Sequence, residues 1–268
     1  MRAAACLLVA LAIAVAGCGS DSAGDVLGQT ADNLGTIRSG DLTFRLAAAT
    51  KGGPDVGFEL QGPFALAKPG GLPVTDMSVT RLAGGAEQKI ELVSTGRKAF
   101  VTVGGSTYEL PPSRVESLRT AGAARGGGLE TLDIGKWTKD PTLSNGGTVA
   151  GTPTDHVHAR LDVVQATNDL LALLSSLGAG SARRISGRDA DQLRRAVRSA
   201  SIDVFTGKED RLLRRLTINA DLRANAPAAV RRALGALGEV TFRLELAIAH
   251  PNRPVHVSAP ADAQPLPG

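Results

Sequence analysis

Apolar and polar residues alternate along most of this chain. The alternating runs are centred on residues 42–46, 56–66, 77–79, 90–92, 99–103, 157–161, 202–204, 216–222 and 240–248. A period of two predicts β-strands with one buried and one solvated face, and the Gly-Gly pairs between some runs are typical of hairpin turns. The pattern therefore predicts about ten strands, paired in an antiparallel sheet that faces water on one side.

Segments with helical spacing lie between these runs. Val26, Leu27, Leu34 and Ile37 form an apolar stripe that predicts a helix beginning at Asp25. Four more helices are expected, after Pro111-Pro112, near residues 163–177, near residues 189–198 and from Asn225 through Leu234.

Residues 121–150 are rich in glycine and weakly patterned, which predicts a mobile loop around the single Trp137. Taken together, the elements predict an α+β fold. We expect one large curved antiparallel sheet, a half-barrel of about ten strands, whose concave apolar face is covered by helices.

The N-terminus has the layout of a secretory signal. Arg2 precedes an uncharged run, Ala3 to Ala16, which is too short to span a bilayer, and small residues lead to a cysteine. Val15-Ala16-Gly17-Cys18 resembles the lipobox of bacterial lipoproteins. The resemblance implies a diacylglyceryl group on the Cys18 sulfur and cleavage after Gly17. The alternative is an ordinary signal peptide with an incidental cysteine.

These features divide the chain into four parts. We expect a signal peptide over residues 1–17, a lipidated flexible tether over 18–24, one domain over 25–258 and a loose C-terminal tail over 259–268. Cys6 would leave with the signal, so the domain has no disulfide and needs a sizeable apolar core.

The charge balance excludes nucleic acid as a predicted partner. The 30 basic and 26 acidic residues are interspersed, and no long basic block occurs. The slight excess of basic residues is compatible with no more than a weak preference for anionic lipid surfaces.

The order of elements resembles the LppX/LprA/LprF/LprG lipoproteins of actinobacteria, which share a fold with the lipoprotein carriers LolA and LolB. The resemblance rests on the lipobox, on residues 34–41 between the first helix and first strand, and on the hairpin of residues 202–218. It implies a half-barrel with an apolar cavity for acyl chains. The chain departs from LolA in its aromatic content of 3%, so Leu, Val, Ile and a few Phe would line the cavity.

Ten residues on the apolar sides of the predicted strands are candidates for the cavity lining. They are Phe44, Leu46, Phe58, Leu60, Ile90, Val101, Leu216, Ile218, Phe242 and Leu244. From the pattern alone, these side chains could equally pack in a closed core, and the family resemblance is what favours a cavity.

No other chemistry is predicted. His156 and His158 would share one strand face, but His250 and His256 are too remote in sequence to supply a third metal ligand, so we expect solvent-facing histidines and no metal or cofactor. The Gly-x-Ser-x-Gly elbow is absent, and lipidation would leave no thiol, so the sequence does not predict an enzyme.

The sequence thus predicts a lipid-anchored protein at the extracytoplasmic face of the cell membrane. It would bind acyl chains of lipids or lipoglycans and carry or present them, with an envelope export protein as a further partner. The alternative is an envelope scaffold or sensor with a filled core that binds a protein partner.

Overall fold

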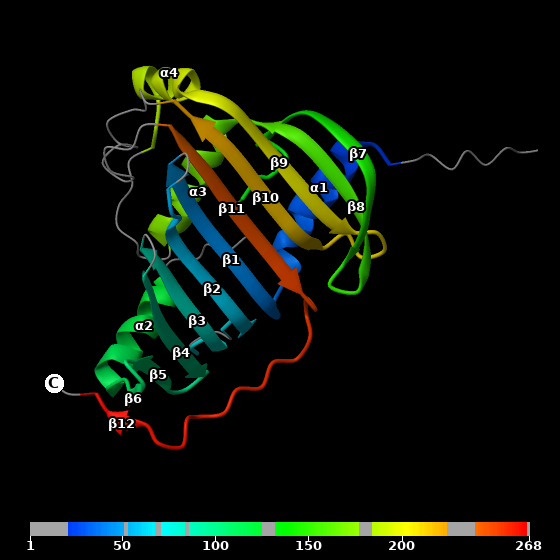
Figure 1. The fold of residues 1–268 in the computed structure, drawn as a ribbon. Coiled ribbons are helices and arrows are strands. Elements are labelled where there is room, and N and C mark those ends of the chain that lie inside the picture. The colour runs from blue at the N-terminus through cyan, green and yellow to red at the C-terminus, as the bar shows by residue number, and fades with distance from the viewer. Residues whose placement is uncertain are drawn as a thin grey trace, which may run out of the picture.

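In the computed structural model, one twelve-stranded sheet curves around helices that lie on one of its faces (Figure 1). The structure describes residues 21–50, 53–67, 71–83, 86–124, 132–176, 184–223 and 239–266. The sheet begins with β12 at one edge and ends with β7 at the other, so it is open. The predicted α+β class and curved antiparallel sheet are confirmed, with twelve strands in place of about ten.

The strands are long and mostly joined by short turns. In chain order they are β1 (Ser39–Thr50), β2 (Val56–Ala65), β3 (Val74–Ala83), β4 (Ala86–Thr95), β5 (Ala99–Val103), β6 (Ser106–Glu109), β7 (Thr138–Val149), β8 (Thr152–Leu161), β9 (Val197–Gly207), β10 (Leu213–Leu222), β11 (Val240–Ala249) and β12 (Gln264–Pro265). Their order in the sheet is β12-β6-β5-β4-β3-β2-β1-β11-β10-β9-β8-β7. Neighbouring strands are antiparallel except β12 and β6, which are parallel.

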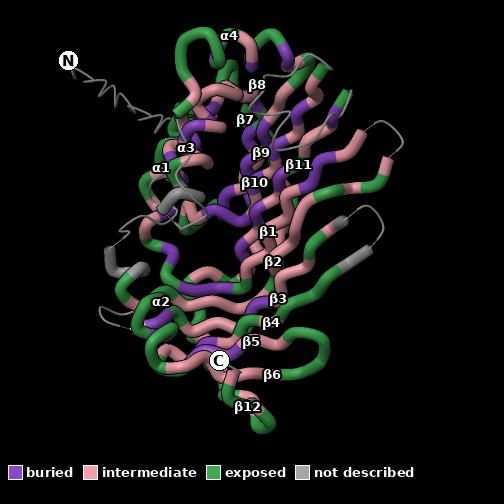
Figure 2. The backbone as a smooth tube through the Cα atoms, turned by 90° about the vertical axis from the view of Figure 1, so that its left-hand side faces the viewer, coloured by how far each residue is buried: buried purple, intermediate pink, exposed green. Residues whose placement is uncertain are grey.

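Helices cover one face of this sheet, which we call the inner face (Figures 1 and 2). α1 (Ala23–Asn33) is followed by a 3-10 turn, η1 (Leu34–Thr36), and packs against β7, β8 and β9. α3 (Val163–Ser176) joins the same core through Ala166 and Leu170. α2 (Pro112–Ala124) lies at the β5 and β6 end, and α4 (Gly187–Ala196) packs against α3 and β9.

The main core lies between α1 and strands β8 to β11. Val26, Leu27 and Leu34 of the α1 region pack with inner-face residues such as Val204 and Leu216, all of which are buried. A hydroxyl pair adds a polar contact there, because Thr30 Oγ1 and Thr206 Oγ1 lie 2.7 Å apart and both residues are fully buried. A second, smaller cluster joins Val115 of α2 to Leu72, Leu110 and Ala99.

The loop predicted over residues 121–150 is wrong for most of its described length. α2 continues to Ala124, residues 134–137 form a turn in which Ile134 and Trp137 are buried, and residues 138–149 are strand β7. β7 is an edge strand whose side chains are nearly all exposed, so it has no alternating pattern to read. The predicted helix from Asn225 through Leu234 lies outside the described residues.

Both ends of the domain are more ordered than the sequence suggested. Of residues 18–24, expected to form a flexible tether, the described part belongs to the fold, because Ser22 caps α1 and Ala23 and Gly24 are in its first turn. Asp25, where the helix was expected to begin, is the N3 residue of a capping box with Ser22. In the tail expected to be loose, Gln264 and Pro265 pair with Tyr108 and Glu109 of β6.

Candidate functional site

One apolar row crosses the inner face of the sheet from β8 to β5. Residues directly opposite each other in neighbouring strands share a face, and the register therefore places one residue of each strand in this row. In order across the sheet they are Val157, Val204, Leu216, Leu246, Phe44, Leu60, Val79, Ile90 and Val103. The row has no charged member, so the inner face is continuous apolar surface over nine strands.

Exposure divides this row into a closed and an open half. Leu216, beneath α1, is 2% exposed, whereas Ile90 is 38% and Val103 is 50% exposed. Leu92 is also on the inner face, opposite Val101, and is 40% exposed. α1 packs against β7 to β9, at the far side of the sheet from β4 and β5, so water reaches these apolar side chains.

We define the open strip as seven apolar residues on the inner face of β2 to β5 that lie outside the main core and keep part of their surface exposed; Met77 on the same face is buried, and Val56, at the start of β2, is not counted. Its members are Phe58, Leu60, Val79, Ile90, Leu92, Val101 and Val103. At one end of the strip, Val115 of α2 packs with Ala99 of β5, so the strip continues beneath the start of α2. Figure 2 shows buried segments concentrated on β8 to β11 and intermediate or exposed ones on β2 to β5.

The structure places the ten candidate lining residues on one face of the sheet but in two environments. Leu216, Ile218 and Leu244 are buried in the main core. Phe44, Leu46 and Phe242 are partly buried and pack against that core. Phe58, Leu60, Ile90 and Val101 belong to the open strip. Val79, Leu92 and Val103 complete the strip; the alternation of their runs marked them as inward-facing, but they were not among the ten candidates.

A small pocket lies beside α3, and none of its lining residues belongs to the open strip. It has a volume of about 150 Å³ and is lined by Asn168, Asp169, Leu171, Ala172 and Arg184. Sites for drug-sized ligands usually enclose about 300–1,000 Å³. Asn168 and Asp169 already form hydrogen bonds within the protein, so this pocket does not have the size or lining of an acyl-chain site.

The inner face has one charged residue among the described positions of β1 to β6. Arg81 lies opposite Phe58 on β2 and opposite Gln88 on β4, and Phe58 is on the inner face because its ring packs 5.6 Å from that of Phe44. Arg81 is exposed, and it takes part in none of the ion pairs formed by the described residues. It stands two residues along β3 from Val79, beside the open strip.

The predicted histidine pair lies on the outer face. His156 Nε2 and His158 Nδ1 are each 2.8 Å from Asp203 Oδ1, so one carboxylate oxygen joins the two rings. The His156 ring stacks on Phe205 with centroids 4.4 Å apart, and Arg215 covers the same phenyl ring. Within the described part of the chain, no three His, Cys, Asp or Glu side chains are placed to hold a metal ion.

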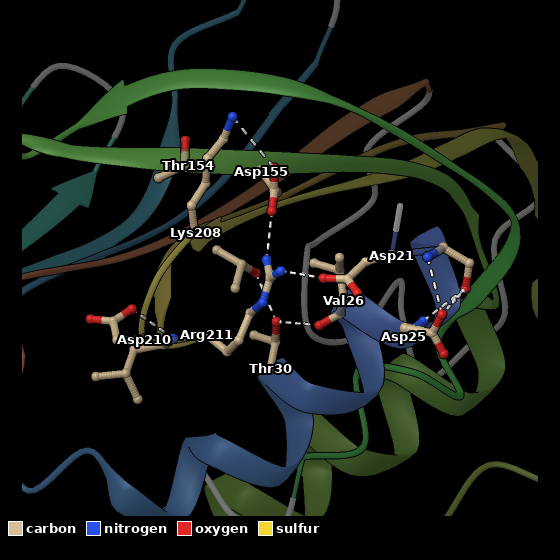
Figure 3. A network of polar contacts seen from close by, with 12 residues as sticks. Asp21, Asp25, Val26, Thr30, Thr154, Asp155, Lys208, Asp210 and Arg211 are labelled. Atoms are coloured by element: carbon tan, nitrogen blue, oxygen red, sulfur yellow. Dashed lines mark hydrogen bonds and ion pairs between the residues drawn. The ribbon is translucent and has the colours of Figure 1, made fainter. Parts of the chain in front are cut away.

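The first residues that the structure describes are held by a polar network (Figure 3). Arg211 donates to Asp155 Oδ2 at 2.5 Å and also to Asp21, and Lys208 Nζ lies 3.7 Å from Asp155. Ser22 donates to Asp25 through its side chain and its backbone N–H, and these bonds lower the pKa of the Asp25 carboxyl. Asp21 and the start of α1 are therefore fixed to the turn between β9 and β10. Asp21 is three residues after Cys18, which lies outside the described residues.

Among the helices of the described residues, none combines the length and the apolar character needed to cross a bilayer.

Comparisons with known proteins bear on the fold. No protein-family model and no curated protein sequence matches this chain. Among solved structures, LprF from Mycobacterium bovis aligns over 89% of this chain and 97% of its own, with 12% identity and a TM-score of 0.51.

Two more distant structures also align over most of the chain. Lipoprotein LppX from Mycobacterium tuberculosis aligns over 88% of this chain and 98% of its own, with 13% identity and a TM-score of 0.43. A LolA superfamily protein from Nitrosomonas europaea covers 88% and 96%, with 10% identity and a TM-score of 0.22. The match to LprF spans nearly all of both chains, so this protein has the LprF fold. The fold implied by the sequence resemblance is thereby confirmed.

Proposed function

We propose that this protein binds the acyl chains of lipids along the open strip and carries or presents them at the extracytoplasmic face of the cell membrane. The observation that carries the proposal is the exposure of Ile90, Leu92 and Val103 on the inner face, where the same row is buried at Leu216. A large contiguous patch of exposed apolar side chains is typical of a ligand-binding or interaction site. The LprF fold supports this reading.

The chemistry of the strip suits a hydrocarbon chain. Its members are aliphatic or phenyl side chains, which offer dispersion contacts and no hydrogen-bond partners for a polar ligand. Each methylene removed from water contributes about 0.8 kcal/mol, so the methylenes of an acyl chain bound along the strip together contribute several kcal/mol of binding free energy. That is enough for reversible binding, as a carrier requires. The proposed role is binding without covalent chemistry.

In this proposal the anchor is Cys18. The lipobox-like residues 15–18 support acylation of the Cys18 sulfur, and two acyl chains give stable membrane attachment. The ligand is a lipid or lipoglycan, and an envelope export protein would receive or deliver it.

A lipid-binding assay with strip variants tests this function. Ile90→Gln and Val103→Gln place amides on exposed strip positions, so they should weaken the uptake of a fluorescent fatty acid while leaving the unfolding midpoint nearly unchanged. Lys89→Gln is the matched control, because Lys89 is the strand neighbour of Ile90, faces the other side and pairs with Glu91. Mass spectrometry of protein extracted from its native membrane should find co-purified lipid. Lipid-free protein, or equal uptake by all variants, would contradict the proposal.

The scaffold alternative also has an observation in its favour. The inner face between α1 and β8 to β11 is filled by the protein's own side chains, as Ile202 and Val204 are fully buried. Under that alternative the open strip would receive an apolar segment of a protein partner. Retention of a protein, with no lipid, by the wild-type chain and its loss from Val103→Gln would favour the scaffold.

A further inference from the structure

We propose that Arg81 binds the anionic head group, a carboxylate or a phosphate, of the lipid whose acyl chain lies on the open strip. The inference rests on the proposed function and adds the class of lipid. It starts from the position of a single charge: among the described inner-face positions of β1 to β6, every residue other than Arg81 is apolar or uncharged.

The register fixes the place of Arg81 relative to the strip. Phe58 lies directly opposite it on β2, and Val79 is the next residue of β3 on the same face. Ile90 in turn lies opposite Val79 on β4. Arg81 therefore stands at the end of the strip nearest the β3–β4 hairpin. Beyond it on this face lies one short row, Val56, Ala83 and Ala86, whereas the other rows of the strip extend in the opposite direction.

A charge at one end and apolar side chains beyond it match a lipid with a charged head group and an alkyl chain. From Arg81 to Met77, β3 advances by about 13 Å at about 3.3 Å per residue, past Val79 and the row of Ile90. A head group at Arg81 would leave its alkyl chain lying over Val79, Leu92 and Val101. An uncharged polar neighbour, Gln88, lies opposite Arg81 and adds an amide at the same end.

The charge state of the site favours an anion. Arg81 forms none of the ion pairs described in the structure, whereas Arg45 on the outer face has both Asp55 and Glu59 within reach. A guanidinium presents two parallel N–H donors that match the oxygens of a carboxylate or phosphate. When an acyl chain displaces water from the strip, an acidic head group beside Arg81 gains this contact at lowered dielectric.

Paired lipids that differ only in the head group test the inference. Oleate is compared with oleyl alcohol, and dioleoyl phosphatidic acid with dioleoylglycerol, in equilibrium titrations of the full-length protein. The wild-type protein should prefer the anionic member of at least one pair by about tenfold, the effect of one charge-assisted contact. The first pair reports on a carboxylate and the second on a phosphate.

Variants of Arg81 then assign the preference. Arg81→Gln should remove the preference for the anionic lipid and leave the affinity for its neutral partner unchanged, and Arg81→Lys should retain part of it. Arg243→Gln is the control, because Arg243 is an exposed arginine on the outer face.

Each outcome has one meaning. Equal affinity of the wild type for both members of both pairs, or an anionic preference that survives in Arg81→Gln, overturns the inference while leaving acyl binding intact. Failure to bind any of the four lipids overturns the proposed function and, with it, the role of Arg81.

Discussion

The indole N–H of Trp137 donates to Asp169 Oδ2 at 2.7 Å, which ties the turn before β7 to α3. Trp137 is 1% exposed and packs in the main core with Leu132 and Ile134. Gln165 donates to both oxygens of the same carboxylate. A segment with no pattern in the sequence thus contributes the largest buried side chain of the core.

Replacing Trp137 should therefore destabilise the whole domain. Trp137→Phe removes a hydrogen-bond donor and part of a buried ring, so we expect a loss of about 2–3 kcal/mol in the free energy of unfolding. Urea denaturation followed by far-ultraviolet circular dichroism measures it. Asp169→Asn keeps an oxygen for the indole and should cost less; equal stability of wild type and Trp137→Phe would show that the turn does not contribute to the core.

The two halves of the inner face should respond differently to truncation. Leu216 and Val103 belong to one cross-strand row, but Leu216 is buried beneath α1 and Val103 is half exposed. Leu216→Ala should cost about 2–5 kcal/mol of unfolding free energy, because it leaves a cavity. Val103→Ala should change stability by less than about 1 kcal/mol, as expected of an exposed position. Similar losses for the two variants, measured by urea denaturation, would mean that the strip is closed.

The sequence predicts which side chains of each strand lie on the inner face, but it does not predict which of them a helix covers. Alternation assigns Phe44 and Leu216 to the inner face because the side-chain period of a strand is two. Whether a helix covers that face depends on long-range packing, because α1 precedes β1 in the chain but packs against β7, β8 and β9. Such long-range packing leaves no local pattern, so Leu216 and Ile90 look alike in the sequence although one is buried and the other exposed.

Local signals explain the other differences. Ser22 and Asp25 have the spacing of a capping box, which would have placed the start of α1 correctly. β7 could not be recognised, since an edge strand exposed on both faces needs no apolar alternation, and Pro141 lowers its strand propensity. Arg81 interrupts an apolar face, but its position beside the strip depends on the register of β2, β3 and β4.

Acid should weaken the start of α1 through Asp25. The hydrogen bonds from Ser22 hold the pKa of the Asp25 carboxyl below its usual value in the folded protein. Its stabilising contribution is therefore complete above the unfolded-state pKa of about 4 and is lost as the pH falls through the lower folded-state pKa. Asp25→Ala should lower the unfolding temperature at pH 7 and make it fall less steeply between about pH 4 and pH 2 than in the wild type. Asp32→Ala, at an exposed position of the same helix, should retain the wild-type profile; identical slopes for Asp25→Ala and wild type would exclude this role.

Arg211 should keep the start of α1 in place. Its guanidinium joins Asp21 to Asp155 of β8, and it is held in the turn after β9 by its own N–H, which donates to the Gly207 carbonyl. Arg211→Gln keeps a similar size but loses both charge-assisted contacts, so we expect about 2 kcal/mol less stability. The amides in the first turns of α1 should exchange faster with deuterium, while those of β10 should not, because β10 remains paired with β9 and β11. Arg195→Gln removes an exposed arginine of α4 and should leave both rates unchanged. Unaltered exchange at the start of α1 in Arg211→Gln would mean that the apolar contacts of Val26 and Leu27 alone hold the helix on the sheet.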